Sequence, residues 1–278
     1  MLKKEMGLGE KDRTFPKKGT MAILFSRSVN KVLALEDVIY DDYPHFAAHM
    51  DALEQLHHAY ALHKSQHNLM DYDDLLVVFL RLLKDFPDIR RHISSDYEYI
   101  MVDEYQDTNQ IQADIVYLLA SEKNNVMVVG DDSQSIYAFR GAEIKNILSF
   151  PDHFPGTTVI RLEENYRSVQ PILHLTNQII DQAAYKYTKT LFSRKEGGSR
   201  PCLTMTSDEN SQSRFIIDHI RDLSLKGVRL NRIAVLFRAG FHSFDLEIEL
   251  GKEGIPFVKV GGFKFMEKAH IKDVLAHL

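Results

Sequence analysis

The chain has 278 residues, which suggests about two domains at roughly 150 residues each. Apolar residues make up 44% of the sequence and charged residues 26%, which is typical of globular proteins and excludes disordered and fibrous classes. The formal net charge of -5 excludes a histone-like polycation. Residues 1–31 are nevertheless rich in Lys and Arg, so the composition leaves room for a local basic region.

A single cysteine, Cys202, excludes an internal disulfide, and the sequence has no CxxC pair to hold zinc. Both features are typical of proteins from a reducing, intracellular compartment. No apolar run approaches the roughly 18 residues that suggest a membrane span. The amino terminus also lacks the apolar region of a secretory signal. We therefore expect a cytoplasmic protein with no membrane contact.

The first third of the chain has a helical pattern. From residue 20 to about 85, apolar side chains recur at spacings of three and four, as at Leu53, Leu56 and Tyr60. A further helix is predicted to begin at the acidic residues 71–74, because carboxylates stabilise a helix amino end.

Beyond residue 98, short apolar runs alternate with helix-length segments. The runs are predicted strands, at 99–102, 126–129, 158–162 and 232–237. The main helix-length segments are 108–120, 169–184 and 209–226. This alternation predicts an α/β fold with a parallel sheet covered on both faces. Ligands bind beyond the carboxyl ends of such strands, so residues just after each run are candidates for function.

The first run ends in two acids, Asp103 and Glu104, followed by Gln106 and Asp107. Two carboxylates at a strand end suit a magnesium nucleotide site. One carboxylate holds the hydrated metal, and the other takes a proton from an attacking water. The alternative is a surface turn with two acids, which the position at a strand end makes less favoured.

The second run leads into Gly130, which we expect to permit a tight turn. Gln134 can form hydrogen bonds to a terminal phosphate or to its attacking water. Tyr137, Phe139 and Arg140 combine aromatic faces with a positive charge, a mixture that suits unpaired bases. The alternative that one of the two aromatic residues is a core side chain stays open.

The third run is followed by Tyr166 and Arg167. The tyrosine ring offers a flat face for a purine, and the guanidinium can direct a fork of donors at a phosphate. The tetrapeptide NYRS alone is a weak signal.

The segments VDEYQDTN, VVGDDSQSIYAFRGA and LEENYRS, in this order and at this spacing, resemble motifs II, III and IV of UvrD/Rep-type superfamily 1 DNA helicases. Residues 71–76 resemble a segment that precedes motif II, and residues 261–275 resemble the second motor domain. The similarity covers nearly the whole chain.

The resemblance implies two partial RecA-like (P-loop NTPase) parallel-sheet domains with an amino-terminal helical subdomain. Residues 1–70 would correspond to part of subdomain 1B, residues 71–157 to the carboxyl-terminal half of motor domain 1A, and residues 158–278 to the amino-terminal part of motor domain 2A. A motor domain without its P-loop strand is expected to expose a sheet edge or apolar surface.

The resemblance also implies roles at an ATP and Mg²⁺ site. Asp103 would bind magnesium, and Glu104 would contact the metal and activate water. Gln134 would couple the γ-phosphate to the DNA track. Tyr166 would stack on adenine, and Arg167 would act as an arginine finger in the cleft between the two motor domains, opposite Glu104.

The same resemblance implies DNA contacts. Tyr137 and Phe139 would lie along single-stranded DNA, with Arg140 beside them. Relatives usually have Trp at the position of Phe139, so the stacking face is smaller here. The implied activity is ATP-driven 3′-to-5′ movement on single-stranded DNA and unwinding of duplex DNA.

A phosphate cradle of the form GxxxxGK[ST] is absent, the nearest fragments being residues 17–20 and 251–254. Motifs V and VI would lie beyond Leu278. We therefore expect a helicase fragment that is inactive alone and needs the Walker A part, subdomain 2B and motifs V and VI as partners. A truncated gene is favoured over a natural degenerate relative, because the ATP-facing residues are intact. The alternative is a non-catalytic DNA- or partner-binding module.

Two further patterns in the sequence are weaker. His63 and His67 have the i, i+4 spacing of a metal site, but no Glu follows His63, and a solvated helix face is favoured. Residues 87–88 and 143–145 superficially resemble a nuclease PD…ExK arrangement, but their long separation favours coincidence.

Overall fold

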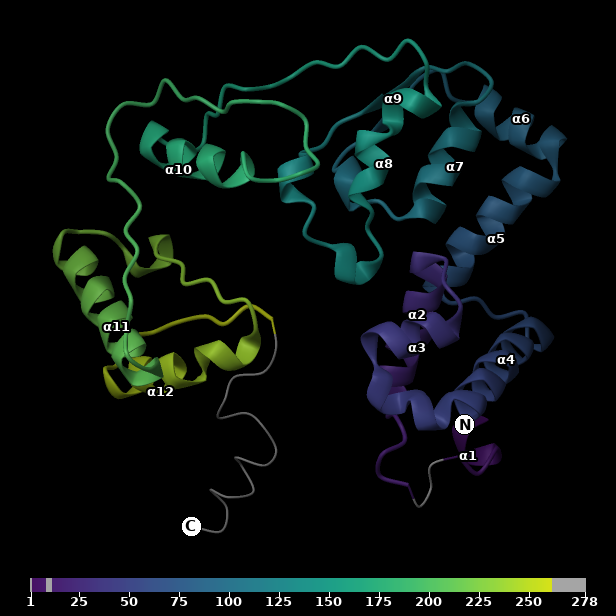
Figure 1. Ribbon diagram of the computed structural model, residues 1–278, viewed down its shortest axis with the longest axis horizontal. Coiled ribbons are helices and arrows are strands. Elements are labelled where there is room, and N and C mark those ends of the chain that lie inside the picture. Colours follow the sequence, from purple (N-terminus) through teal and green to yellow (C-terminus); the bar gives the residue numbers. More distant parts are fainter. Residues whose placement is uncertain (1, 9–11, 262–278) are drawn as a thin grey trace. The chain divides into compact units, whose positions relative to one another are not determined.

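The computed structural model describes residues 2–8 and 12–261 (Figure 1). The chain divides into two compact units, Met1–Ser199 and Arg200–Leu278. The resemblance of residues 262–275 to the second motor domain lies outside the described residues. Among the described helices, none is both long and apolar enough to cross a lipid bilayer.

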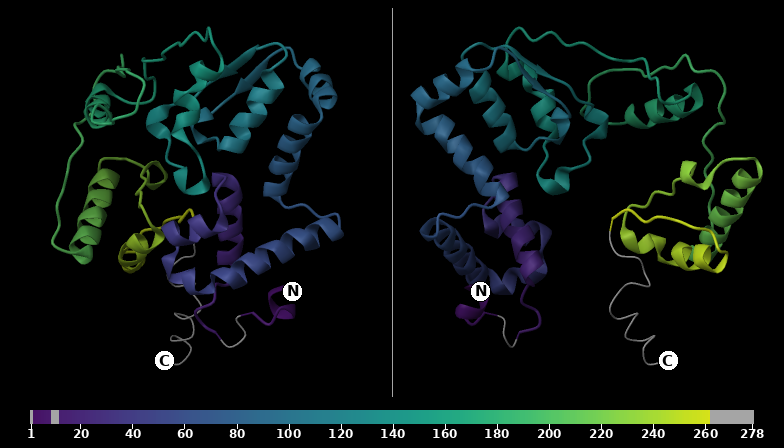
Figure 2. Two further views of the ribbon diagram at one scale, coloured as in Figure 1. Left: turned by 45° about the vertical axis from the view of Figure 1, so that its right-hand side comes forward. Right: turned by 180° about the vertical axis from the view of Figure 1, so that it is seen from behind.

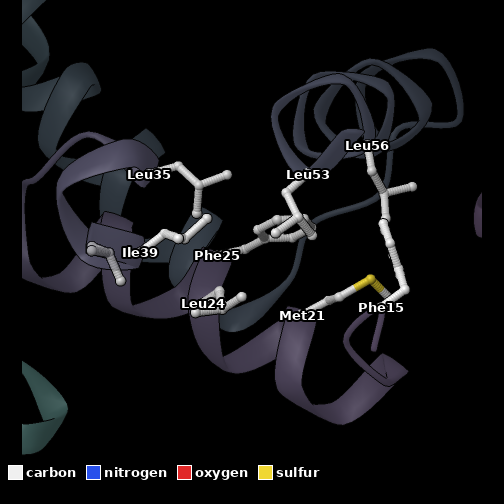
Figure 3. Packing of buried hydrophobic residues seen from close by; sticks show 9 residues of the cluster. Phe15, Met21, Leu24, Phe25, Leu35, Ile39, Leu53 and Leu56 are labelled. Atoms are coloured by element: carbon white, nitrogen blue, oxygen red, sulfur yellow. The ribbon is translucent and has the colours of Figure 1, made fainter. Parts of the chain in front are cut away.

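The first unit begins with helices, of which the apolar spacing predicts those between residues 20 and 85. They are α1 (Leu2–Glu5), α2 (Lys18–Lys31), α3 (Leu35–Asp42), the 3₁₀ helix η1 (Pro44–His49), α4 (Met50–Gln66), α5 (Tyr72–Asp85) and α6 (Pro87–Ser95). Side chains from α2, α3 and α4 and from the segment before α2 form a buried apolar cluster (Figure 3). The labelled members are Phe15, Met21, Leu24, Phe25, Leu35, Ile39, Leu53 and Leu56.

Helix α5 begins where the acidic residues predict. Asp71 is its N-cap, and Oδ1 of Asp71 accepts a hydrogen bond from the backbone N–H of Asp74 at 2.9 Å. Oδ2 of Asp74 accepts in return from the N–H of Asp71, also at 2.9 Å. This reciprocal pair satisfies two N–H groups that have no partner within the helix. Lys64 of α4 pairs with both carboxylates, which ties α4 to the start of α5.

Strands β1 (Ile100–Val102) and β2 (Val126–Val128) form a parallel pair. Helix α7 (Gln110–Ala120) lies between them in the sequence. Figure 2 shows the two arrows side by side. The side chains of Ile100, Val102, Val126 and Val128 pack against a core that includes residues of α8 (Ile144–Leu148) and α9 (Phe150–His153). The opposite face carries Met101 and Met127, which are paired in register and are 71% and 52% exposed.

The predicted strands at 158–162 and 232–237 are wrong. Residues 158–162 have no regular secondary structure, and Ile160 and Leu162 are exposed. The other segment begins with the end of η5 (Leu230–Arg232) and then continues without a strand. An apolar run becomes a strand only when a neighbouring backbone accepts its hydrogen bonds, and in the described residues neither run has one. The α/β class with a small parallel sheet is confirmed, but the described residues contain one such sheet, not two.

The helices predicted at 169–184 and 209–226 are present. The first is α10 (Gln170–Ile180), which is shorter than expected and lies in the first unit. The second is α11 (Glu209–Leu225), which packs on α12 (Phe244–Lys252) in the second unit. Their shared core consists of Ile217, Ile220, Leu246 and Leu250.

Candidate functional site

Of the two acids after β1, Glu104 has an unusual backbone conformation. Glu104 has a φ of 51°, a left-handed conformation that is uncommon for residues other than glycine and costs of order 1–3 kcal/mol. Asp103 accepts a hydrogen bond from the N–H of Glu104 at 2.9 Å. Both residues are exposed. Two solvated carboxylates at a strand end are the oxygen donors that a hydrated magnesium ion prefers.

Gln106 joins these acids to the next loop. It lies in η2 (Tyr105–Asp107) and is only 1% exposed. Its Nε2 donates to Oε2 of Glu104 at 2.7 Å, and its Oε1 accepts from the N–H of Asp131 at 3.0 Å. The only signal in the sequence is an amide within an acidic motif, and sequence analysis gave it no role.

Gly130 permits this contact. A Cβ at this position would lie 2.5 Å from Oε1 of Gln106 and 2.8 Å from Cδ1 of Ile147. Its backbone is not left-handed. Glycine is therefore required here for close packing and not for a left-handed backbone conformation.

Asp131 organises the loop that carries Gln134, in η3 (Asp132–Gln134). Its Oδ2 accepts from Nε2 of Gln134 at 2.7 Å, and its Oδ1 accepts from the N–H of Ser133 at 3.0 Å. Lys189 forms ion pairs with Asp131 and, at 2.6 Å, with Asp132. Burial alone would raise the pKa of Asp131, but the hydrogen bonds from Lys189 and Gln134 hold it below its ordinary value. Burial opposes the charge on Lys189 as well, yet the two carboxylates raise its pKa above the ordinary value.

Gln134 lines an open pocket of about 480 Å³ together with Glu164, Asn165, Tyr166 and Arg167. Oδ1 of Asn165 accepts from the backbone N–H groups of Arg167 at 2.9 Å and of Ser168 at 2.7 Å, which fixes the turn. Tyr166 is 77% exposed. The structure therefore brings together three of the predicted site residues, Gln134, Tyr166 and Arg167.

The predicted metal-binding acids, Asp103 and Glu104, are not among the residues that line this pocket. They are connected to it by hydrogen bonds. Glu104 accepts from Gln106, Gln106 accepts from the backbone of Asp131, and the Asp131 side chain accepts from Gln134. Glu104, a predicted metal-binding acid, and Gln134, which is predicted to bind the terminal phosphate, therefore belong to one hydrogen-bond network.

The predicted DNA-contacting residues lie at η4 (Ala138–Arg140), which ends with Arg140. Tyr137 and Phe139 are exposed, and their ring centroids are 5.9 Å apart with an interplanar angle of 44°. The alternative that one of them is a core side chain is therefore wrong. The two rings present an apolar surface to solvent. A basic residue, Arg140, follows Phe139 in the sequence.

Asn30, at the end of α2, connects this loop to two other segments. Its Nδ2 donates to Oδ1 of Asp73 at 2.7 Å, and its Oδ1 accepts from Nδ2 of Asn109 at 2.7 Å. Gly141, which follows η4 with a φ of 90°, packs so closely that a Cβ would lie 2.9 Å from the carbonyl oxygen of Asn30. Sequence analysis did not single out Asn30.

The histidines with i, i+4 spacing at the end of α4 contact each other. The rings of His63 and His67 lie 4.2 Å apart, and Nδ1 of His67 is 2.9 Å from the carbonyl oxygen of His63. Across residues 2–8 and 12–261, no group of three or more His, Cys, Asp or Glu side chains is arranged to hold a metal ion.

Comparison with known proteins identifies the family. Residues 3–155 match the model of the UvrD/REP helicase N-terminal domain, and residues 160–278 match that of the UvrD-like helicase C-terminal domain. The chain belongs to the UvrD/Rep helicase family. The resemblance carried by motifs II, III and IV is therefore confirmed. The two family models meet between residues 155 and 160, whereas the compact units divide after Ser199.

Similar proteins include the ATP-dependent DNA helicases PcrA of Staphylococcus epidermidis and Staphylococcus aureus. Each is 35% identical to this UvrD/Rep family member over 230 residues, which are 83% of this chain. The matched region is only 32% of each relative, so the chain spans about a third of their length.

Proposed function

We propose that this chain is part of an ATP-dependent DNA helicase that couples ATP hydrolysis to 3′-to-5′ movement on single-stranded DNA and to duplex unwinding. The observation that carries the proposal is the shared pocket of Gln134, Tyr166 and Arg167, together with the hydrogen-bonded path from Gln134 to Glu104. Both relatives named above are ATP-dependent DNA helicases.

In this proposal the pocket receives the nucleotide. The exposed ring of Tyr166 stacks on adenine, and the guanidinium of Arg167 contacts phosphate oxygens. The side-chain amide of Gln134 forms hydrogen bonds near the terminal phosphate. Its attachment to Asp131 restricts its rotation, so the amide is already oriented before the nucleotide binds.

Asp103 and Glu104 fit a magnesium ion, because both carboxylates are exposed and offer oxygen ligands at the end of β1. When bound, the metal would supply positive charge to the phosphates. Glu104 would take the proton of the attacking water, and its hydrogen bond from Gln106 would keep the carboxylate aligned.

Single-stranded DNA would lie along Tyr137 and Phe139. We expect Phe139→Ala to weaken binding by about 1–3 kcal/mol, because each base stacked on an aromatic ring contributes about that much. Fluorescence anisotropy of a labelled oligothymidylate measures the affinity. Phe86→Ala is the matched control, because Phe86 is 54% exposed and Phe139 is 53% exposed. Equal weakening by both variants would contradict this contact.

The sequence has no phosphate cradle, so we propose that the chain alone does not turn over ATP and that segments carrying the Walker A motif, subdomain 2B and motifs V and VI complete the enzyme. The exposed free thiol of Cys202 supports a reducing cytoplasmic setting.

A phosphate-release assay with Mg²⁺-ATP and single-stranded DNA tests the proposal. We expect background rates from the chain alone and DNA-stimulated turnover once a Walker A segment from a UvrD/Rep family helicase is added together with the segments that carry subdomain 2B and motifs V and VI. Glu104→Gln should abolish that turnover, because an amide cannot accept the proton of water. Turnover by the chain alone would contradict the proposed requirement for the cradle.

The second candidate function is a non-catalytic DNA-binding module, which the exposed aromatic pair at Tyr137 and Phe139 would support. Under this alternative, the added segments produce no turnover, while DNA binding that depends on Phe139 persists. The two assays together therefore separate the two functions.

A further inference from the structure

The pocket has two walls that are distant in sequence. The first wall is residues 131–135, which carry Gln134, and the second is residues 163–168, which carry Tyr166 and Arg167. Residues 187–195, called the strap here, form hydrogen bonds with both walls. The strap lies between α10 and the end of the first unit and is almost entirely without regular secondary structure.

The contacts of the strap with the first wall are mainly ionic and are largely shielded from solvent. The Lys189 side chain is 15% exposed and its ammonium group pairs with Asp131 and Asp132. Asp132 is buried, and its Oδ2 also accepts from the backbone N–H of Tyr187 at 3.0 Å. Two adjacent carboxylates repel each other unless a cation lies between them, and Lys189 provides that cation.

The contacts of the strap with the second wall involve mainly backbone groups. The N–H of Thr190 donates to Oε1 of Glu163 at 2.9 Å. The backbone of Phe192 donates to the carbonyl oxygen of Glu163 at 3.0 Å and accepts from the N–H of Asn165 at 2.7 Å. The strap is also held on α10, where Asn177 forms hydrogen bonds with both backbone groups of Leu191.

We propose that the strap holds the two walls of the pocket together and that Lys189 is a positioning residue, which orients Gln134 through Asp131. Lys189 holds one carboxylate oxygen of Asp131, and Nε2 of Gln134 donates to the other. Without the lysine, only the backbone N–H of Ser133 still holds Oδ1 of Asp131, so the carboxylate is less restricted and the amide of Gln134 is less firmly oriented. The inference that this orientation of Gln134 serves phosphate recognition rests on the proposed function. The inference that the strap holds the two walls together does not.

The test uses the full chain without ligand. Lys189→Met keeps the aliphatic stem and removes the charge, and Lys189→Arg restores a cation that can reach two carboxylates. Lys186→Met is the matched control, because Lys186 is a nearby lysine, 20% exposed, that pairs with Asp181 outside the pocket. Hydrogen–deuterium exchange is followed in both walls, and the side-chain amide signal of Gln134 is followed by ¹H–¹⁵N NMR.

For Lys189→Met, we expect exchange to become about tenfold faster in both walls together and the Gln134 amide signal to move. Lys189→Arg should restore both readouts, and Lys186→Met should change neither. If Lys189→Met does not fold, Lys189→Gln should give the same pattern at smaller amplitude. Faster exchange confined to the strap, an unmoved Gln134 signal or an equal effect of Lys186→Met would overturn the proposal.

Calorimetric titration with Mg²⁺-ATP, in the presence of the Walker A segment, separates this inference from the proposed function. If both walls respond as expected but no protein binds ATP, the strap is supported and the proposed function is contradicted. If the unsubstituted protein binds ATP but the walls do not respond to Lys189→Met, the strap is overturned and the proposed function is unaffected.

Discussion

Gln106→Leu is expected to destabilise the first unit by about 2–4 kcal/mol. The substitution removes a hydrogen bond to the Glu104 carboxylate and leaves the partly buried N–H of Asp131 without its acceptor. Because Glu104 is exposed, its hydrogen bond is expected to contribute about 0.5–1.5 kcal/mol, and a donor left without an acceptor costs about 1–3 kcal/mol. Leucine has a similar size, so the change leaves no large cavity. Urea unfolding followed by circular dichroism measures the loss.

Gln110→Leu is the matched control for this prediction. Gln110 is exposed at the start of α7, where its side chain donates to Asp114 at 2.7 Å. Loss of an exposed hydrogen bond is expected to change the free energy of unfolding by less than about 0.5 kcal/mol. If the two variants were equally stable, the bridge between the two loops would not contribute to folding.

Gly141→Ala is expected to cost about 2–5 kcal/mol of unfolding free energy. A φ of 90° is unfavourable for alanine, at roughly 1–2 kcal/mol. In addition, the new Cβ would lie 2.9 Å from the carbonyl oxygen of Asn30 and 3.0 Å from its carbonyl carbon. Overpacking against such atoms adds about 1–3 kcal/mol. Thermal unfolding should therefore begin at a lower temperature in this variant.

Gly156→Ala separates the two contributions to this cost. Gly156 has a φ of 88°, but nothing lies within 4 Å of the position that a Cβ would occupy. Its substitution should cost only the conformational part, about 1–2 kcal/mol. A loss at Gly156 as large as that at Gly141 would show that the close approach to Asn30 has no energetic weight.

The features that sequence predicted best depend on neighbours in the chain. The acids at residues 71–74 predicted the start of α5 because a capping box closes within four residues. Strands β1 and β2 were predicted because each is an apolar run followed by polar residues, and a helix between them allows parallel pairing. The same local signal at 158–162 and 232–237 was misleading, since a strand also requires a partner that the run itself does not encode.

The residues of the candidate site also differ in how well the sequence predicts them. Gln134, Tyr166 and Arg167 were found because each follows an apolar run, and the pocket that joins them is present even though the third run is not a strand. Lys189 was missed because its contact with Asp132 spans 57 residues of sequence, and a lone lysine in a polar segment has no distinguishing pattern. Long-range ion pairs of this kind become visible only in three dimensions.

Asn30 is expected to affect how the first unit unfolds. Its one side-chain amide contacts both Asp73 and Asn109, which is 79 residues away, and its backbone lies close to Gly141. Residues within one hydrogen-bond network are energetically coupled, so the losses caused by replacing Asn30 and Asn109 do not add. The amino-terminal helices and the segment that carries the acidic strand end are therefore expected to melt cooperatively as a single block.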